Sequence, residues 1–268
     1  GRESGALMCG GNIRLINTNV QFINCTFKNN NAENAGGLSI NTAGECLIDG
    51  CQFIENSCNT RGGALRIGEV EGGGNSASLA IICNCIFSGN RASDNVNTNF
   101  GSNIFINTHE KSRIDIDGTN KFTNQGERGS MIYIIKSGEI SLTDLTFDLA
   151  PNVNERNFRT LQLAGKVTAR IDHCVFRNNG FSGTIAGQQG YVILVGGEND
   201  GDKAEAITHI TNCVFTDCGA TTDAAQFMIN TNSPELRFEN NVINFSSGTA
   251  VQSSSAIRIY RYGTLYVL

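Results

Sequence analysis

The chain has 268 residues, with 31 Gly, 2 Pro, 10 Cys and no Trp, and 40% of its residues are hydrophobic. This content is sufficient for a packed core and argues against a disordered chain. A net charge of −5 argues against general affinity for nucleic acid or anionic membranes. No uninterrupted apolar run reaches the roughly 18 residues of a membrane-spanning helix.

A short repeat dominates the sequence. Each copy contains a short apolar strand, a small polar residue, Cys, any residue and Phe, most clearly at residues 24–27, 50–53, 84–87, 173–176 and 212–215. Weaker copies place Phe122, Phe147 and Ile243 at the Phe position, and successive copies lie 25 to 39 residues apart. A repeat of this length is typical of stacked structural units, each of which packs against its neighbours.

A second short strand falls between the copies and follows a Gly pair at 36–40 and 62–67, with further versions at 10–15, 101–106, 131–134, 161–163, 226–229 and 256–259. No stretch shows a sustained helical period. Each strand therefore pairs with the same strand of the next repeat, which predicts an all-β parallel β-helix of about eight or nine coils, forming one domain over 1–268. A sandwich or a propeller would not repeat Cys-x-Phe at one position.

The pattern Phe-x-x-Asn occurs at 27–30, 53–56 and 87–90, and a Gly-Gly-apolar block follows the first two. This alternation resembles the repeats of polymorphic outer membrane proteins, a branch of the pectate-lyase-like right-handed β-helices, and the match is best over residues 10–106. The resemblance implies a right-handed coil and a bacterial secreted or surface protein, located outside the cell or on its surface and often adhesive. The implied partner is a polysaccharide or a host or cell-surface glycoprotein.

Five cysteines share one repeat position, which predicts a stack of buried thiols inside the rod: Cys25, Cys51, Cys85, Cys174 and Cys213. The other cysteines lie outside this column, and the sequence does not decide whether two of them form a disulfide: Cys9, Cys46, Cys58, Cys83 and Cys218.

The residue before the repeated Cys is Asn24, Asn84 or Asn212, and Asn tolerates a left-handed backbone. These asparagines are predicted to form turns and to hydrogen-bond to the Asn of the next coil. His173 occupies the same position, so we interpret it as a turn residue rather than a catalyst.

Alternation along a strand identifies the outward side chains. In the first strand the outward column is Gln21, Leu47, Ile81, Ser141, Arg170, His209 and Arg237, of which the last three predict a short basic stripe. In the second strand it is Arg14, Ser39, Arg66, Phe105, Tyr133, Gln162, Met228 and Arg258. Phe105 and Tyr133 are then surface neighbours that could stack on sugar rings, unless long inserts cover them.

Two functional hypotheses follow. The first is a non-catalytic adhesin-like or glycan-binding protein that uses Arg170, His209, Arg237, Phe105 and Tyr133. The second is a polysaccharide lyase or hydrolase acting on an acidic glycan, because the resemblance implies that a basic residue of the stripe abstracts a proton. An ordinary solvated face, with ion pairs to Asp172 and Glu239, is the alternative to both. No catalytic residue can be assigned.

No cofactor is predicted. Acidic side chains alternate at 198–202 as in a calcium loop, but the full EF-hand pattern is missing and a solvated loop is favoured.

Overall fold

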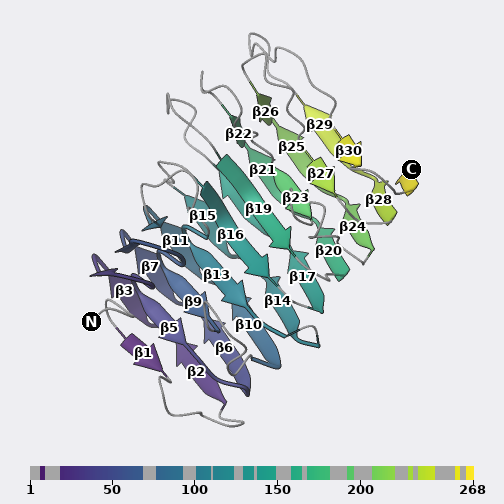
Figure 1. Ribbon diagram of the computed structural model, residues 1–268. Helices are drawn as coiled ribbons and strands as arrows, with labels where there is room; N and C mark the ends of the chain where they lie inside the picture. The colour runs from purple at the N-terminus through teal and green to yellow at the C-terminus, as the bar shows by residue number, and fades with distance from the viewer. Residues whose placement is uncertain are drawn as a thin grey trace.

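The chain folds as a parallel β-helix. The computed structural model describes residues 7–9, 19–68, 77–92, 101–109, 111–123, 129–135, 138–148, 158–164, 168–181, 192–195, 207–220, 229–231, 235–244, 257–259 and 264–268. Within these ranges every regular element is a β-strand. The strands stack in chain order from one end of the rod to the other (Figure 1).

Three long sheets form the walls, and every strand pair in them is parallel. Sheet 1 contains, in spatial order, β1 (Leu7–Cys9), β5 (Leu38–Ile40), β9 (Leu65–Ile67), β13 (Ile104–Asn107), β16 (Gly129–Ile135), β19 (Phe158–Ala164), β23 (Ile193–Val195), β27 (Ile229–Thr231) and β30 (Ile257–Ile259). Sheet 2 contains β2 (Val20–Ile23), β6 (Glu45–Asp49), β10 (Leu79–Cys83), β14 (Arg113–Asp117), β17 (Glu139–Thr143), β20 (Thr168–Asp172), β24 (Thr208–Thr211), β28 (Glu235–Glu239) and β31 (Thr264–Val267).

Sheet 3 is made of three-residue strands: β3 (Thr26–Lys28), β7 (Gln52–Ile54), β11 (Ile86–Ser88), β15 (Lys121–Thr123), β18 (Thr146–Asp148), β21 (Val175–Arg177), β25 (Val214–Thr216) and β29 (Val242–Asn244). Two small sheets complete the described strands: β4 (Asn31–Ala32) with β8 (Ser57–Cys58) and β12 (Arg91–Ala92), and β22 (Gly180–Phe181) with β26 (Gly219–Ala220). One coil therefore passes from sheet 2 to sheet 3 and then to sheet 1, as predicted from the two repeated strands.

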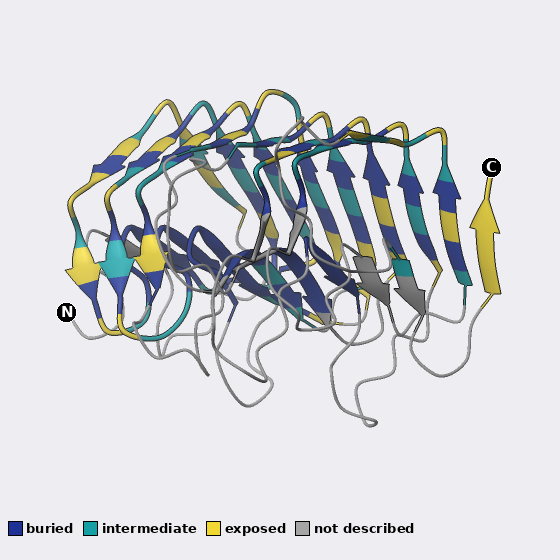
Figure 2. Cartoon of the chain, turned by 90° about the horizontal axis from the view of Figure 1, so that it is seen from above, coloured by how far each residue is buried: buried dark blue, intermediate teal, exposed yellow. Residues whose placement is uncertain are grey.

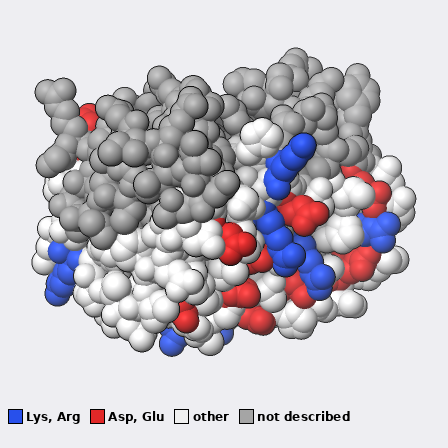
Figure 3. All heavy atoms as spheres, turned by 90° about the horizontal axis from the view of Figure 1, so that it is seen from below, with Lys and Arg blue, Asp and Glu red and all other residues white. Residues whose placement is uncertain are grey.

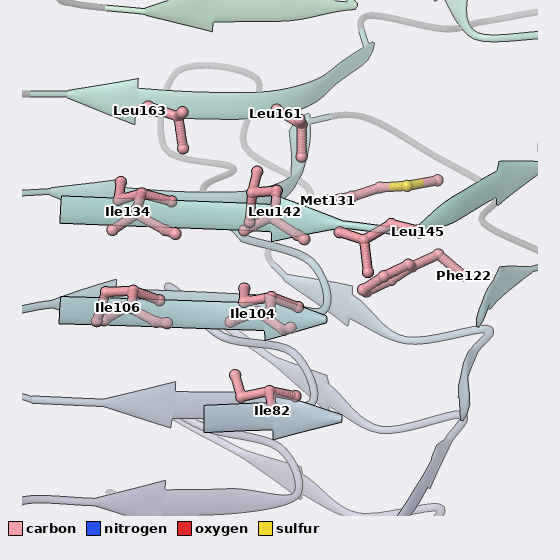
Figure 4. Packing of buried hydrophobic residues seen from close by; sticks show 14 of the residues in the cluster. Ile82, Ile104, Ile106, Phe122, Met131, Ile134, Leu142, Leu145, Leu161 and Leu163 are labelled. Atoms are coloured by element: carbon pink, nitrogen blue, oxygen red, sulfur yellow. The ribbon is translucent and has the colours of Figure 1, made fainter. Parts of the chain in front are cut away.

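The interior is filled by columns of side chains, each built from the same kind of residue in successive coils. The Phe of each repeat stacks on the Phe of the next coil, with ring centroids 4.8 to 5.1 Å apart from Phe27 to Phe215. Ile and Leu side chains of the other two sheets point into the same interior (Figure 4). Along the strands of sheet 2, buried residues alternate with half-buried or exposed ones (Figure 2), which is the pattern expected of a wall with one solvent face.

The cysteine column is also internal. Cys51, Cys85, Cys174 and Cys213 are fully buried, and Cys25 in the outermost described coil is half-buried. Nine of the ten cysteines are described and none of them is in a disulfide. The off-column cysteines Cys46, Cys58, Cys83 and Cys218 therefore form no bridge, and the side chain of Cys9 lies outside the described residues.

A left-handed turn joins sheet 2 to sheet 3, as the Asn positions predicted. Asn24, Asn84, His173, Asn212 and Asn240 all have φ between 52° and 56°. The predicted partner of these asparagines was wrong: Asn84 Nδ2 donates to Asp49 Oδ1 at 2.8 Å, and Asn212 Nδ2 donates to Asp172 Oδ1 at 2.8 Å. The amide bonds instead to a carboxylate at the end of the preceding strand, because β6 ends in Asp49 and β20 ends in Asp172.

Candidate functional site

The outward face of sheet 2 brings the predicted basic stripe together. Arg170 lies opposite His209, and His209 lies opposite Arg237, in adjacent strands β20, β24 and β28. Arg170 and Arg237 are exposed and His209 is half-buried. We name the row Arg170–His209–Arg237–Tyr266 the stripe, because the pairing of β28 with β31 places Tyr266 next to Arg237.

Tyr266 was missed by the sequence analysis. Its ring lies beneath the guanidinium of Arg237, with Cζ 5.4 Å from the ring centroid, a distance at which a cation and an aromatic face attract each other. The tyrosine side chain remains 43% exposed. The alternating pattern at 264–267 was a usable signal, since aligning Leu265 with Leu236 would have added Tyr266 to the outward column.

Each arginine of the stripe has a carboxylate partner on its own strand. Arg170 Nη2 lies 3.3 Å from Asp172 Oδ2, and Arg237 Nε lies 2.5 Å from Glu235 Oε1. Side chains two residues apart on a strand point to the same face, so a pairing of this kind is built into the sequence. Arg237 was expected to pair with Glu239, and Glu235 is its partner instead.

The stripe is consequently a mixed face and not a purely basic one. Basic side chains lie beside acidic ones on the molecular surface (Figure 3). Arg113 and Asp115 on β14 form a third pair of the same kind, at 2.9 Å. Neighbouring donors and acceptors of this type suit a ligand rich in hydroxyl groups, because each hydroxyl both donates and accepts.

Asp172 is the most heavily bonded group of the face. Its carboxylate accepts hydrogen bonds from Thr211 Oγ1 at 2.6 Å and Asn212 Nδ2 at 2.8 Å, and it lies 3.1 Å from His173 Nδ1. Burial alone would raise the pKa of Asp172, but the hydrogen bonds from Thr211, Asn212, His173 and Arg170 outweigh it and hold the pKa well below its usual range. Asp172 is thus ionised at neutral pH, and its hydrogen bonds tie two coils together.

The prediction that Phe105 and Tyr133 form an exposed aromatic pair is wrong in part. Phe105 and Tyr133 are neighbours, with ring centroids 5.6 Å apart, but Phe105 is fully buried and Tyr133 is half-buried. The guanidinium of Arg61 lies over the Phe105 ring, with Cζ 5.4 Å from the centroid. Phe105 therefore cannot stack on a sugar in this conformation.

Three further residues of that second column are also covered, as is Leu194 in the coil between Gln162 and Met228, while the side chain of Arg258 lies outside the described residues. Ser39, Arg66, Gln162 and Leu194 are buried in sheet 1 although they lie in outward register positions. The strands β5, β9 and β23 are buried along their whole length, so this wall has no exposed face within the described residues.

Two positions of the column were misaligned. Met8 rather than Arg14 lies opposite Ser39, because β1 is the strand that pairs with β5 at this end of the sheet. Asn230 rather than Met228 lies between Leu194 and Arg258. Arg14 and Met228 lie outside the described residues.

The structure gives no metal-binding group of three or more His, Cys, Asp or Glu side chains in the part of the chain that it describes. The acidic segment 198–202 lies outside that part. Asp115 and Asp117 stand at alternate positions of β14, where Asp115 accepts hydrogen bonds from Arg113.

The chain was compared with protein-family models, curated proteins and solved structures, and no match was found in any of the three comparisons. Among the described residues, no helix is long and apolar enough to cross a membrane.

Proposed function

We propose that the chain is a secreted or surface-displayed β-helix that binds a glycan without catalysis, and that the ligand lies along the stripe. The observation that carries this proposal is the in-register row of Arg170, His209, Arg237 and Tyr266 on one exposed wall. Adjacent strands are about 4.8 Å apart, a step comparable with one sugar ring along an extended glycan. Successive coils can therefore offer equivalent contacts to successive sugars.

The chemistry of the face supports a hydroxyl-rich ligand. The guanidinium groups donate, the carboxylate of Glu235 accepts, and the exposed ring of Tyr266 offers an apolar surface for a sugar. Since each arginine is partly neutralised by its carboxylate, the proposal favours neutral or weakly acidic glycans over densely charged ones.

A polysaccharide lyase that acts on an acidic glycan is the second candidate for this wall. Its base would have to lose a proton near neutral pH. The hydrogen bond with Glu235, and then the charge of that carboxylate, raise the pKa of Arg237. Arg170 and Arg237 are each paired with a carboxylate that stabilises the protonated guanidinium, so neither is suited to abstract a proton, and we favour the binding function.

Binding to immobilised neutral glycans and to polygalacturonate tests the proposal. Replacing Arg237 or Tyr266 with Ala should lower affinity for the best ligand at least tenfold, about 1.4 kcal/mol. The matched control is Arg113→Ala, which removes an arginine paired with Asp115 in the same way but outside the stripe. Equal effects of all three substitutions, or none, would contradict the proposed site. Release of unsaturated sugar from polygalacturonate would support the lyase instead.

A further inference from the structure

We infer that Asn24 is an acceptor for N-linked glycosylation. The sequence contains 33 Asn, and only Asn24 and Asn244 are followed by a residue other than Pro and then by Ser or Thr. The first of these tripeptides is Asn24-Cys25-Thr26. The motif Asn-x-Ser/Thr is what oligosaccharide-transferring enzymes recognise on secreted chains, so the inference rests on the proposed extracellular location.

Asn24 occupies an exposed turn between β2 and β3. Its φ of 54° is left-handed, and its backbone N–H donates to the carbonyl oxygen of Asp49 at 2.9 Å. Both Asn24 and Thr26 are exposed. The turn is therefore held by the backbone, and attachment of a sugar to the carboxamide leaves this bond in place.

The carboxamide of Asn24 differs from those of two equivalents at the same turn in other coils. Asn84 and Asn212 donate their Nδ2 hydrogens to Asp49 and Asp172 of the preceding strand. Among the described residues, Asn24 Nδ2 has no hydrogen-bond partner. β2 is the outermost described strand of sheet 2, so no described strand precedes it to supply a carboxylate.

The orientation of the carboxamide also suits the reaction. A Cβ atom placed on Gly50 of the next coil would lie 2.3 Å from Asn24 Oδ1, and Oδ1 is the atom of Asn24 nearest to that position. The oxygen is thus turned toward the neighbouring coil and the nitrogen away from it. Only a residue without a side chain at position 50 leaves room for this arrangement.

The modification needs a co-substrate of one class, an oligosaccharide linked to a lipid through a diphosphate. Asn24 Nδ2 bonds to C1 of the first sugar, the bond between C1 and the diphosphate oxygen breaks, and the lipid diphosphate leaves. The nitrogen loses one proton to a base of the transferase and keeps one N–H. No oxidation or reduction is involved.

A glycan at this position would stand at the end of the described rod. β2 and β3 are the outermost strands of sheets 2 and 3, and Asn244 lies on β29, the outermost strand at the opposite end of sheet 3.

The experiment is expression of the full chain, behind a signal peptide, in a eukaryotic secretory host. Cells and medium are analysed together by peptide mapping before and after treatment with peptide N-glycosidase. We expect the peptide containing Asn24 to carry a glycan that the enzyme removes, and Asn24→Gln and Thr26→Ala to abolish it, while Thr26→Ser retains it. An unmodified Asn24 in the wild-type chain would overturn the inference. No glycan ligand enters this assay, so its failure is distinct from failure of the proposed binding function.

A matched variant tests the structural argument. Ile86→Thr turns Asn84-Cys85-Ile86 into the same tripeptide as at Asn24, but Asn84 already uses its amide to bind Asp49. Relative to the same chains made without glycans, the glycan on Asn24 should leave the thermal unfolding midpoint unchanged, whereas one on Asn84 should lower it. An equal loss at both positions would contradict the assignment of Asn24 as the accommodating site.

Discussion

At the scale of single residues, Asp172 shows how the solvent face of the rod is held in shape. Its carboxylate is mostly buried, with 8% of the side chain exposed, and it bonds to groups of its own coil and of the next one. Because these bonds require the ionised form, the pKa of Asp172 lies well below the ordinary value.

Asp172→Asn should lower the free energy of unfolding by about 2 kcal/mol at neutral pH, since hydrogen bonds to charged groups contribute about 1.5–3 kcal/mol. The folded-state pKa is depressed, so this stability is present above the unfolded pKa near 3.8 and is lost as pH falls below it. Urea denaturation of both proteins between pH 7 and pH 2.5 should show the difference shrinking with acid. Asp115→Asn, which removes only the pair with Arg113, is the control; an equal loss in both variants would refute the role given to Asp172.

The thiols provide a second residue-scale property. The hydrogen bond with Cys51, and then burial, raise the pKa of Cys85, and the corresponding bond with Cys213, and then burial, raise the pKa of Cys174. Cys83 is half-buried, and burial followed by Asp49 raises its pKa to about 11. The same hydrogen bonds within the two pairs lower the pKa of Cys51 to about 6 and also lower that of Cys213. All four thiols of these pairs are fully buried, however, and inaccessible thiols react slowly.

Maleimide labelling of the native protein at pH 7 should modify Cys25 first and Cys83 later, while Cys51, Cys85, Cys174 and Cys213 react only after unfolding. Peptide mapping of timed samples gives the order. Rapid native-state modification of Cys51 or Cys85 would show that the cysteine column is not inside the rod.

At the scale of elements, two columns of buried side chains connect successive coils. One is the stack of Phe rings, and the other is a ladder of hydrogen-bonded asparagines. Asn56 is fully buried: its Oδ1 accepts from Asn30 Nδ2 at 2.8 Å, and its Nδ2 donates to the carbonyl oxygen of Phe27 at 2.9 Å and to Asn90 Oδ1 at 3.0 Å. Removing this amide would break hydrogen bonds to both neighbouring coils, to Asn30 and Phe27 in one and to Asn90 in the other.

Phe53→Ala should therefore cost about 3–5 kcal/mol of unfolding free energy, as other buried Phe deletions do, and Asn56→Ala should cost at least about 2 kcal/mol. Asn31→Ala, which removes one exposed bond to Ser57, should change the stability by less than about 0.5 kcal/mol. Chemical denaturation measures all three. A loss for Asn56→Ala no greater than that for Asn31→Ala would contradict the ladder.

The Phe and cysteine columns follow from the sequence, because one repeated position gives one column of the rod. The buried asparagine ladder was not predicted: the Asn–Asn hydrogen bonds were expected at the turn before the repeated Cys, and they occur at the Asn of Phe-x-x-Asn instead. Burial of sheet 1 was not predictable. Alternation identifies which side of a strand Phe105 is on, but Arg61 covers that ring from a position more than 40 residues earlier in the chain. Likewise, Arg237 has acidic residues two positions away on both sides, and only the three-dimensional structure identifies Glu235 as its partner.

At the scale of the whole molecule, the described walls differ in how much of their outward face is exposed to solvent. Sheet 1 is buried on both faces in β5, β9 and β23, whereas sheet 2 keeps an outward face in register across nine strands. The second half of that face carries the stripe, with its paired charges and Tyr266. A long, regular wall of this kind is suited to an extended ligand that contacts several coils at once.

The crystal structure of a complex with the best-binding oligosaccharide of the panel tests the central claim most directly. We predict that the sugar lies along β20, β24, β28 and β31, with a ring against Tyr266 and its hydroxyls within hydrogen-bonding distance of Arg170 or Arg237. A ligand bound along sheet 3 or at an insert loop, with the stripe left in solvent, would contradict the account.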